Sequence, residues 1–223
     1  MDPIINYYQE LAPKYDEDRF GNSYGRFIDS QERAILNKLG ASLQGKVLDL
    51  ACGSGRLLNY AEVGLDASSK MLDIAREKYP EKTLVLGPGH QTPFENKTFD
   101  AILIFHFFMH LDEHRIHQIL EECLRILKDE GRIIFDIPSK KRRTLFKVNP
   151  RNWHGALALS LLEIKNHPKI ELKRSFGLLF LPIHRLPTFL RHWFSALDLL
   201  LANSFLQEYS SYLIVEVAKK QGK

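Results

Sequence analysis

The chain has 223 residues, enough for one hydrophobic core, and its 44% hydrophobic and 26% charged residues are typical of a globular protein. This composition excludes long disordered or low-complexity segments. The formal net charge is only +4, from 31 Lys and Arg against 27 Asp and Glu, which gives no indication of a broad basic surface for nucleic acid. We expect a single domain over residues 1–223.

The sequence contains no signal for export or membrane insertion. The first residues, MDPIINYYQE, lack both the basic start and the apolar core of a signal peptide, and no stretch approaches the roughly 18 apolar residues of a spanning helix. Cys52 and Cys123 are far apart and form no CxxC pair, which favours a reducing compartment without disulfides. We therefore expect a cytoplasmic protein.

The first two thirds of the chain alternate between helical and strand-like patterns. Residues 3–39 have apolar side chains spaced for one face of a helix, and Gly40 ends that pattern. Strands are expected at 46–50, 62–65, 83–86, 100–105 and 132–137, with helices at 68–79 and 112–127. Only about eleven residues separate the first two strands, so any helix between them must be very short. This alternation predicts an open parallel sheet with helices on both sides.

Beyond Pro138 the alternation is less regular. The basic run at 140–143, KKRR, is expected in a solvated loop, with a phosphate, nucleic-acid or anionic membrane contact as the alternative. Helices are expected at 153–164 and 187–202, a strand-like segment at 169–180, and a final strand at 211–218. A closing pair of strands after a parallel set indicates an antiparallel edge.

The glycine-rich stretch after the first strand, VLDLACGSG (47–55), predicts a ligand site. In an open parallel sheet the ligand lies beyond the carboxyl ends of the strands. Gly53 and Gly55 let a ligand approach the backbone closely, and Asp66 at the tip of the second strand can accept hydrogen bonds from both hydroxyls of a ribose. A dinucleotide site needs G-x-G-x-x-G, but Arg56 stands at the third glycine position, so that alternative is weakened.

Four motifs in register resemble the class I S-adenosylmethionine-dependent methyltransferases. They are DLACGSG (49–55), VGLDASSKML (63–72), TPFENKTFD (92–100) and LRILKDEG (124–131), and they are similar to the small-molecule branch that includes the ubiquinone and menaquinone biosynthesis enzymes. The resemblance covers about residues 7–138. It implies an α/β, Rossmann-like sheet of seven strands, mostly parallel with an antiparallel final strand and with helices on both faces.

The resemblance also implies a division of the chain and a cofactor site. Residues 1–45 would be an N-terminal helical lid, 46–138 the cofactor-binding core, 139–208 a substrate-side insertion and cover, and 209–219 the closing strand. S-adenosyl-L-methionine would be the cofactor and S-adenosyl-L-homocysteine the product. The implied cofactor-binding residues are Tyr15, Asp49, Ala51, Gly53, Gly55, Asp66, Ala67, Met71, Gly89, His90, Phe105 and His110.

One departure from the family pattern affects how adenine would be bound. Such enzymes usually carry an acid after the third strand, but this chain reads Gly87, Pro88, Gly89, His90. Proline has no acceptor for the adenine amino group, so backbone groups near Gly89 and His90 would have to read the base. We expect somewhat weaker cofactor binding from this change.

Four histidines after the fourth strand are candidates for chemistry: His106, His110, His114 and His117. Their spacing suggests a metal site, but His106 lies at the strand end and the helix begins only near Asp112, so the four cannot share one face, and no metal is expected. His106 is the candidate catalytic residue, as a general base, with a polar lining role or a structural role as alternatives. His110 more simply supports the loop and the cofactor pocket.

The sequence points to a class of acceptor without identifying it. DNA base methyltransferases tend to carry an acid or amide, two prolines and an aromatic residue where this chain has FHFF (105–108), so duplex DNA is not expected as a partner. We expect most of the apolar stretch 176–209 to be core or a helical cover over the active site. The alternatives are a pocket for an apolar acceptor or a surface that contacts a membrane or a second subunit. We expect a small-molecule acceptor. The alternatives are RNA or protein methylation and a non-catalytic module that binds S-adenosylmethionine.

Overall fold

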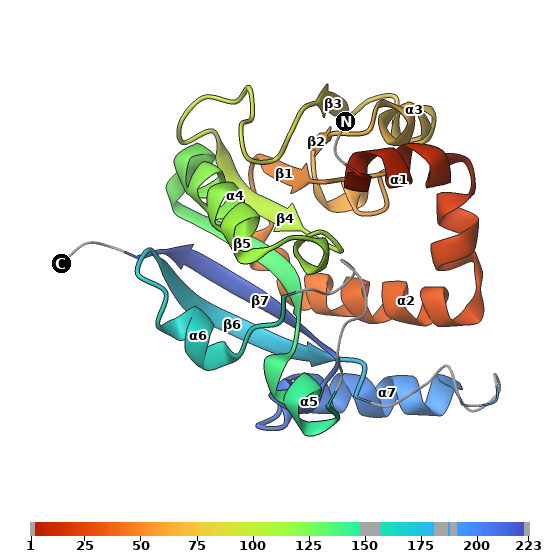
Figure 1. Cartoon of the computed structure of the whole chain (residues 1–223), viewed down its shortest axis with the longest axis vertical. Coiled ribbons are helices and arrows are strands. Elements are labelled where there is room, and N and C mark those ends of the chain that lie inside the picture. The colour runs from red at the N-terminus through yellow and green to blue at the C-terminus, as the bar shows by residue number, and fades with distance from the viewer. Residues whose placement is uncertain (1–2, 148–156, 181–186, 188–190, 221–223) are drawn as a thin grey trace.

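Seven strands build the sheet of this computed structural model, which describes residues 3–147, 157–180, 187 and 191–220. They are β1 (Val47–Leu50), β2 (Val63–Asp66), β3 (Thr83–Leu86), β4 (Phe99–Ile104), β5 (Leu127–Pro138), β6 (Ile170–Leu178) and β7 (Tyr212–Lys219). Their order is β3-β2-β1-β4-β5-β7-β6 (Figure 1). The pairs from β3 to β5 are parallel, and β7 is antiparallel to both β5 and β6. The predicted fold class is confirmed.

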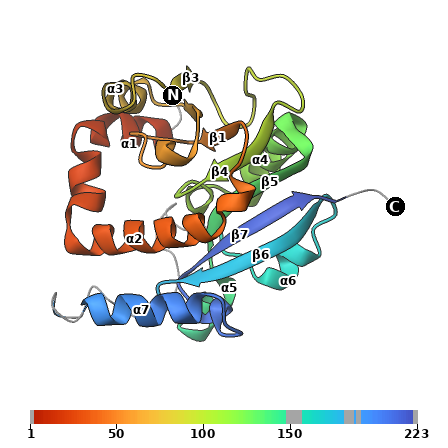
Figure 2. The same cartoon turned by 180° about the vertical axis from the view of Figure 1, so that it is seen from behind.

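The helices cover both faces of this sheet. They are α1 (Pro3–Leu11), α2 (Ser23–Lys38), α3 (Ser69–Lys78), α4 (Glu113–Ile126), α5 (Lys140–Leu145), α6 (Leu161–Lys165) and α7 (Arg191–Ala202). Figure 1 shows α4 and α6 in front of the sheet, and Figure 2 shows α2 and α7 on the opposite side.

Alternating strand residues divide the core into two layers. In β4, Ile102 and Ile104 pack with α4 and α6, whereas Ala101 and Leu103 pack with α2, α3 and α7. Successive side chains of a strand point to opposite faces, so a strand that is apolar throughout needs cover on both. The continuous apolar run of β4 was therefore a correct indication of a central strand.

The strand order reverses at β1, and open α/β sheets bind their ligands at such a reversal. From β1 the order runs outward through β2 to β3 on one side and through β4 to β5 on the other. The loops that leave β1 and β4 therefore diverge to opposite faces, which opens a crevice at the carboxyl edge between these two strands.

The N-terminal segment is not the continuous helix that the sequence pattern over 3–39 predicts. It is divided into α1, a 3-10 turn at Ala12–Lys14, a π-helical turn at Glu17–Gly21, and α2. Pro13 lies in the 3-10 turn, where it lacks an amide hydrogen for a continuous helix. Asn22 then caps α2 by accepting hydrogen bonds from the amides of Tyr24 and Gly25. The breaks let α1 turn over the carboxyl edge of the sheet.

No α-helix follows the glycine-rich stretch. Tight turns lead from Ala51 to a single 3-10 turn at Leu58–Tyr60, which agrees with the expectation of a very short helix. Gly55 has φ of +84°, and a Cβ there would lie 2.9 Å from Leu58 Cδ1 and 3.2 Å from Tyr79 Cδ2. Gly55 therefore serves the packing of the turn against α3.

We expect the substitution Gly55→Ala to lower the free energy of unfolding by about 1–3 kcal/mol, because it combines a left-handed backbone with a close contact. Urea denaturation measures the loss. Gly40→Ala is the matched control, since a Cβ there meets nothing within 4 Å. Equal stability of the two variants would contradict the packing role of Gly55.

The late half of the chain differs from the sequence prediction in three places. The basic run at 140–143 begins helix α5 and is not a loop; Ser139 caps that helix by accepting from the amide of Arg142. Of the predicted helix 153–164, residues 153–156 lie outside the described residues. Residues 157–160 are not helical, because Leu159 bridges to Ser139 and Ser160 caps the short α6. β5 begins at Leu127, five residues before its predicted start.

Two other sequence-based expectations can be compared with the structure. Cys52 and Cys123 are buried free thiols in the structure. Within the described ranges, no helix is long and apolar enough to cross a membrane. The cytoplasmic location stays a prediction.

Candidate functional site

A pocket lies at the carboxyl edge of the sheet, where β1, β2 and β4 end and α1 crosses above them. Its walls come from α1, the glycine-rich turn, the start of α3, the turn after β3, and the loop after β4. The lining residues are Ile4, Ile5, Tyr8, Tyr15, Leu50, Ala51, Gly53, Leu65, Asp66, Ala67, Ser68, Met71, Gly87, Gly89, Phe105, His106, Phe107 and His110. The described residues of this lining include neither lysine nor arginine.

Asp66 fixes the backbone at the floor of this pocket. Its Oδ2 accepts a hydrogen bond of 2.8 Å from the amide of Gly53, and its Oδ1 accepts one of 2.8 Å from the amide of Ser68. Gly53 itself has φ of +52°, and Ala51 adopts φ of +63°. Burial raises the pKa of Asp66, although these amides act in the opposite direction. Asp66 thus joins the turn after β1 to the end of β2 across the pocket.

A second acid, Asp49, lies behind the same turn. It is 3% exposed and borders a small adjoining hollow with Tyr15, Gly53 and Arg56. Burial raises the pKa of Asp49 to about 7, with Arg56 opposing and Asp66 adding to the rise. The buried carboxyl group of Asp49 and the partly buried one of Asp66 make this end of the pocket suited to a cationic ligand, because a nearby positive charge favours their ionised forms.

The N-terminal segment closes the pocket from above through polar contacts. The hydroxyl group of Tyr8 lies 2.9 Å from Nε2 of His110. The hydroxyl of Ser54 donates to Asp16 Oδ1 at 2.6 Å, and Lys78 of α3 forms an ion pair with the same carboxylate. Burial raises the pKa of Tyr15 to about 12, so its hydroxyl stays neutral at physiological pH. The cover is therefore attached to the glycine-rich turn and to α3.

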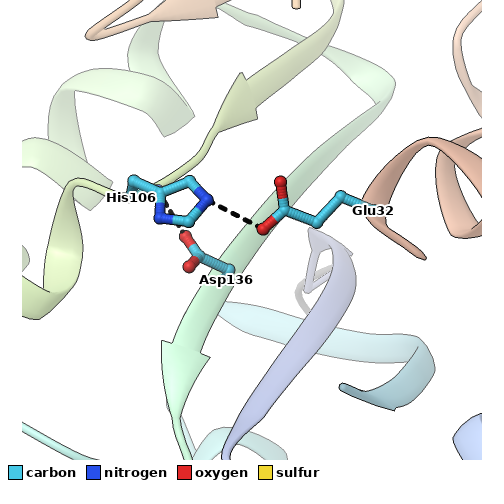
Figure 3. A group of neighbouring side chains, drawn as sticks. All are labelled: Glu32, His106 and Asp136. Carbon is cyan, nitrogen blue, oxygen red and sulfur yellow. Dashed lines mark hydrogen bonds and ion pairs between the residues drawn. The ribbon is translucent and has the colours of Figure 1, made fainter. Parts of the chain in front are cut away.

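A buried charge cluster lies at the edge of the pocket, around His106 (Figure 3). Nε2 of His106 is 2.8 Å from Oε1 of Glu32, a residue of α2 that is 0% exposed. The other oxygen of Glu32, Oε2, pairs with Arg56 at 2.7 Å. From β5, Asp136 Oδ1 accepts a hydrogen bond of 2.7 Å from the backbone amide of His106. His106 has φ of +54°, and this amide contact holds that backbone conformation.

The charges in the cluster determine one another's protonation. Burial alone would raise the pKa of Glu32, but His106 and Arg56 hold it at about 2. Burial alone would lower the pKa of His106, but Glu32 and Asp136 raise it above its ordinary value of 6.5. The imidazole is therefore a stronger base than an isolated histidine.

Glu32, His106 and Asp136 also offer three ligand atoms within 4.8 Å of one another, a spacing that a metal ion could use. Arg56 counts against that use, because its guanidinium is already paired with Glu32 and would repel a cation. The hydrogen-bonded pair of Glu32 and His106 accounts for the same distances without a metal.

A second hollow adjoins the pocket beyond His106. Tyr8, Tyr15, His106 and His110 line both spaces. Most of its other walls are aromatic or aliphatic, and four polar or charged residues complete them. The former are Phe20, Tyr24, Ile28, Met109, Leu178, Leu179 and Tyr212, and the latter are Asp18, Arg19, Asn22 and Glu32. His106 thus lies between the first pocket, which has Asp49 and Asp66 at one end, and the second hollow, whose walls are mostly apolar.

The structure brings together most of the site residues that the sequence predicts. Tyr15, Ala51, Gly53, Asp66, Ala67, Met71, Gly89, Phe105, His106 and His110 line the pocket. Asp49 lies in the adjoining hollow. Gly55 and His90 are outside the pocket lining, since Gly55 packs against α3 and His90 is exposed. Of the four histidines, only His106 and His110 reach the pocket; His114 and His117 lie on α4, which begins after its cap Asp112.

Sequence reasoning missed the partners of His106. One signal was available for Glu32: it lies four residues after Ile28 and three and four before Ile35 and Leu36, on the apolar face of its helix. An acid at a core position needs a cationic partner, but the pattern does not identify which one.

Comparison with known proteins places this chain beside methyltransferases. Residues 48–135 match the family described as "Methyltransferase domain". A demethylmenaquinone methyltransferase of Thermotoga maritima is 36% identical over 135 residues, 57% of this chain and 58% of that protein. One of Paenarthrobacter aurescens is 30% identical over 139 residues, 60% of this chain and 54% of that protein. The chain thus spans rather more than half the length of these relatives.

A solved structure shows the same fold over nearly the whole chain. It is described as an SAM-dependent methyltransferase, possible histamine N-methyltransferase, from Thermotoga maritima. The TM-score is 0.71 at 19% identity, and the match covers 96% of this chain and 99% of the other.

Proposed function

We propose that the chain, whose residues 48–135 match a methyltransferase domain, is an S-adenosylmethionine-dependent methyltransferase that transfers a methyl group to a small-molecule acceptor. The observation that carries this proposal is the pair of adjoining spaces that share His106. The first suits the cofactor and the second suits the acceptor.

The charges around the first pocket favour this cofactor over a dinucleotide. S-adenosylmethionine carries a sulfonium and an ammonium group, whereas a dinucleotide carries an anionic pyrophosphate. Asp49 and Asp66 at the glycine-rich turn attract the former and repel the latter. Asp66, Ala67 and Met71 would hold the nucleoside, and Gly53 with Tyr15 the methionine part. Gly87 and Gly89 offer only backbone to the base.

His106 is the residue we assign as the general base. The cofactor supplies a methyl group on a sulfonium, so the protein has to align the acceptor, exclude water and take up a proton where one is released. The carbon–sulfur bond of the bound cofactor would supply the methyl group, and its electron pair would stay on sulfur. His106 would accept the proton that the acceptor atom loses, and Glu32 would stabilise the resulting imidazolium.

The second hollow supports an apolar or ring-bearing acceptor. Its walls hold Phe20, Tyr24 and Tyr212 beside Leu178 and Leu179, and rings pack well on such surfaces. The relatives named demethylmenaquinone methyltransferases support the same class, since their name gives a ring-bearing acceptor.

Thermal unfolding with S-adenosylmethionine, S-adenosylhomocysteine and NAD added separately tests the proposal. At about 100 times its dissociation constant, a ligand adds roughly 2.7 kcal/mol and raises the midpoint by about 5–10 °C. We expect the shift with the first two ligands only. Binding without turnover of any small molecule would favour the non-catalytic alternative, and turnover of RNA or protein alone would replace the acceptor class. A shift with NAD alone would refute the cofactor assignment.

The pH profile should reveal the coupling of Glu32 to His106. His106 must be neutral to accept a proton, so kcat/KM rises as pH increases through its pKa, which lies above 6.5. In Glu32→Gln the negative charge that raises the pKa of His106 is lost, while burial and Arg56 continue to lower the pKa of His106. The acid limb of the profile should therefore move to lower pH, with a reduced plateau. Measuring kcat/KM from pH about 5 to 9 tests this.

Asp29→Asn is the matched control for this experiment. Asp29 also pairs with Arg56, at 2.7 Å, but it does not bond to His106. We expect the acid limb of the Asp29→Asn profile to coincide with that of the unsubstituted protein. If the acid limbs of Glu32→Gln and Asp29→Asn were displaced equally, Arg56 rather than Glu32 would control the titration of His106.

A further inference from the structure

Exposed apolar side chains gather at one end of the molecule. Among the described residues, eight large apolar side chains are exposed, and six belong to α5, α7 and the turns beside them: Leu145, Phe146, Leu197, Leu200, Phe205 and Tyr209. Phe205 is 89% exposed and Leu200 is 76% exposed. Figures 1 and 2 show both helices at the lower end of the molecule, with α5 nearer the viewer in Figure 1 and α7 nearer in Figure 2. A gathering of this kind marks an interaction surface.

Basic side chains accompany these apolar ones. Residues 140–147, KKRRTLFK, contain five basic residues and no acid. Arg142 donates to the backbone oxygen of Tyr209 at 2.7 Å, and the ammonium group of Lys141 lies 4.7 Å from the Tyr209 ring. Glu163 and Glu208 pair with Lys140 and Lys141, which leaves an excess of positive charge. These contacts join α5 to the turn at Gln207–Tyr209, and we call the exposed apolar and basic side chains of α5, α7 and the turns beside them the α5–α7 surface.

The α5–α7 surface lies beside the second hollow. α5 begins two residues after the carboxyl end of β5, and Leu179, which lines the hollow, donates its amide to Asp198 of α7 at 2.9 Å. We propose that the α5–α7 surface attaches the protein to an anionic lipid bilayer, with Leu145, Phe146, Leu200 and Phe205 entering the interface. Lys140, Lys141 and their basic neighbours would contact the lipid headgroups.

Charge favours a bilayer over a second copy of this chain. A symmetric dimer through this surface would place the basic runs of both copies in one interface, because a two-fold interface uses the same patch on both partners. Their like charges would repel each other. Anionic headgroups instead neutralise the basic residues while the adjacent acyl chains receive the apolar ones. This attachment does not depend on which acceptor is methylated.

Flotation with vesicles tests the attachment. We expect the full chain to bind vesicles of phosphatidylcholine with about a third of phosphatidylglycerol, and not phosphatidylcholine alone. The double substitution Phe146→Ser with Phe205→Ser should lower the partition coefficient by about tenfold or more. Lys140→Gln with Lys141→Gln should lower it by a similar factor, because each basic residue near the surface contributes about fivefold. Raised salt should weaken binding of the unsubstituted chain.

The matched control uses the exposed Leu86, at the end of β3 on the edge of the sheet opposite β6. Leu86 is 57% exposed, and its substitution by Ser should leave vesicle binding unchanged. Thermal unfolding with S-adenosylmethionine checks that all variants fold and bind the cofactor. Failure to bind either vesicle, or equal loss in the control, overturns the proposal. A dimer that dissociates on substitution of Phe146 and Phe205, without vesicle binding, assigns the surface to a second copy.

Discussion

The His106→Asn variant is expected to lose about 100-fold to 10,000-fold in kcat, the usual contribution of a well-placed general base. Asparagine is chosen because it tolerates the positive φ that His106 adopts, and it carries no group that titrates near neutral pH. His106 stands between the cofactor pocket and the apolar hollow, so its loss should affect proton transfer more than cofactor binding. Steady-state kinetics with an accepted substrate, together with a titration of S-adenosylmethionine, separate the two effects.

His117→Asn serves as the control for this variant. His117 is an exposed residue of α4 outside the pocket, and its substitution should leave kcat unchanged. A His106→Asn enzyme with near-normal kcat would limit His106 to lining the pocket. A chelator such as EDTA should leave the activity of the unsubstituted enzyme unchanged. Loss of activity that an added divalent cation restores would instead favour a metal held by Glu32, His106 and Asp136.

Asp66→Ala is expected to weaken S-adenosylmethionine binding tenfold or more. The carboxylate would accept hydrogen bonds from two ribose hydroxyls, and removing such a partner costs roughly 1.5–3 kcal/mol. The substitution also removes the acceptor for the amides of Gly53 and Ser68, so the turn after β1 loses its attachment to β2. Isothermal titration at several cofactor concentrations measures the effect directly.

Two comparisons make that result specific. Asp73→Ala removes an exposed carboxylate of α3, and its affinity should match that of the unsubstituted chain. Asp66→Asn retains one acceptor oxygen, so its affinity for S-adenosylmethionine should lie between those of Asp66→Ala and the unsubstituted chain. Equal affinities for Asp66→Ala and the unsubstituted chain would refute the assignment of this pocket to the cofactor.

The sequence predicted the sheet and the floor of the pocket because local patterns determine both. Apolar runs of β4 and β7 identified strands, and the glycines after β1 with Asp66 after β2 identified the edge where a ligand lies. The N-terminal segment was harder, because its apolar spacing is that of one helix. The break at Pro13 and the π-helical turn depend on how α1 packs over the sheet edge.

The charge cluster could not be predicted, since its members come from four separate parts of the chain. Glu32 lies on α2, Arg56 in the turn after β1, His106 after β4, and Asp136 on β5. Glu32 carried a local signal, its place on the apolar face of its helix, but that signal does not identify its partners. Only the packing of α2 against the sheet brings Glu32 within 2.8 Å of His106. The basic run at 140–143 was misjudged for a related reason, because the helix cap Ser139 is itself fixed by its bond to the oxygen of Glu208.

The N-terminal segment, residues 3–16, both lines the pocket and lies over its opening. Asp16 is held by Ser54 and Lys78, and Tyr8 by His110. In the proposed enzyme, a cofactor that exchanges past α1 would have to break these contacts first. Opening of residues 3–16 would then set an upper bound on the turnover frequency, however fast the methyl transfer itself is.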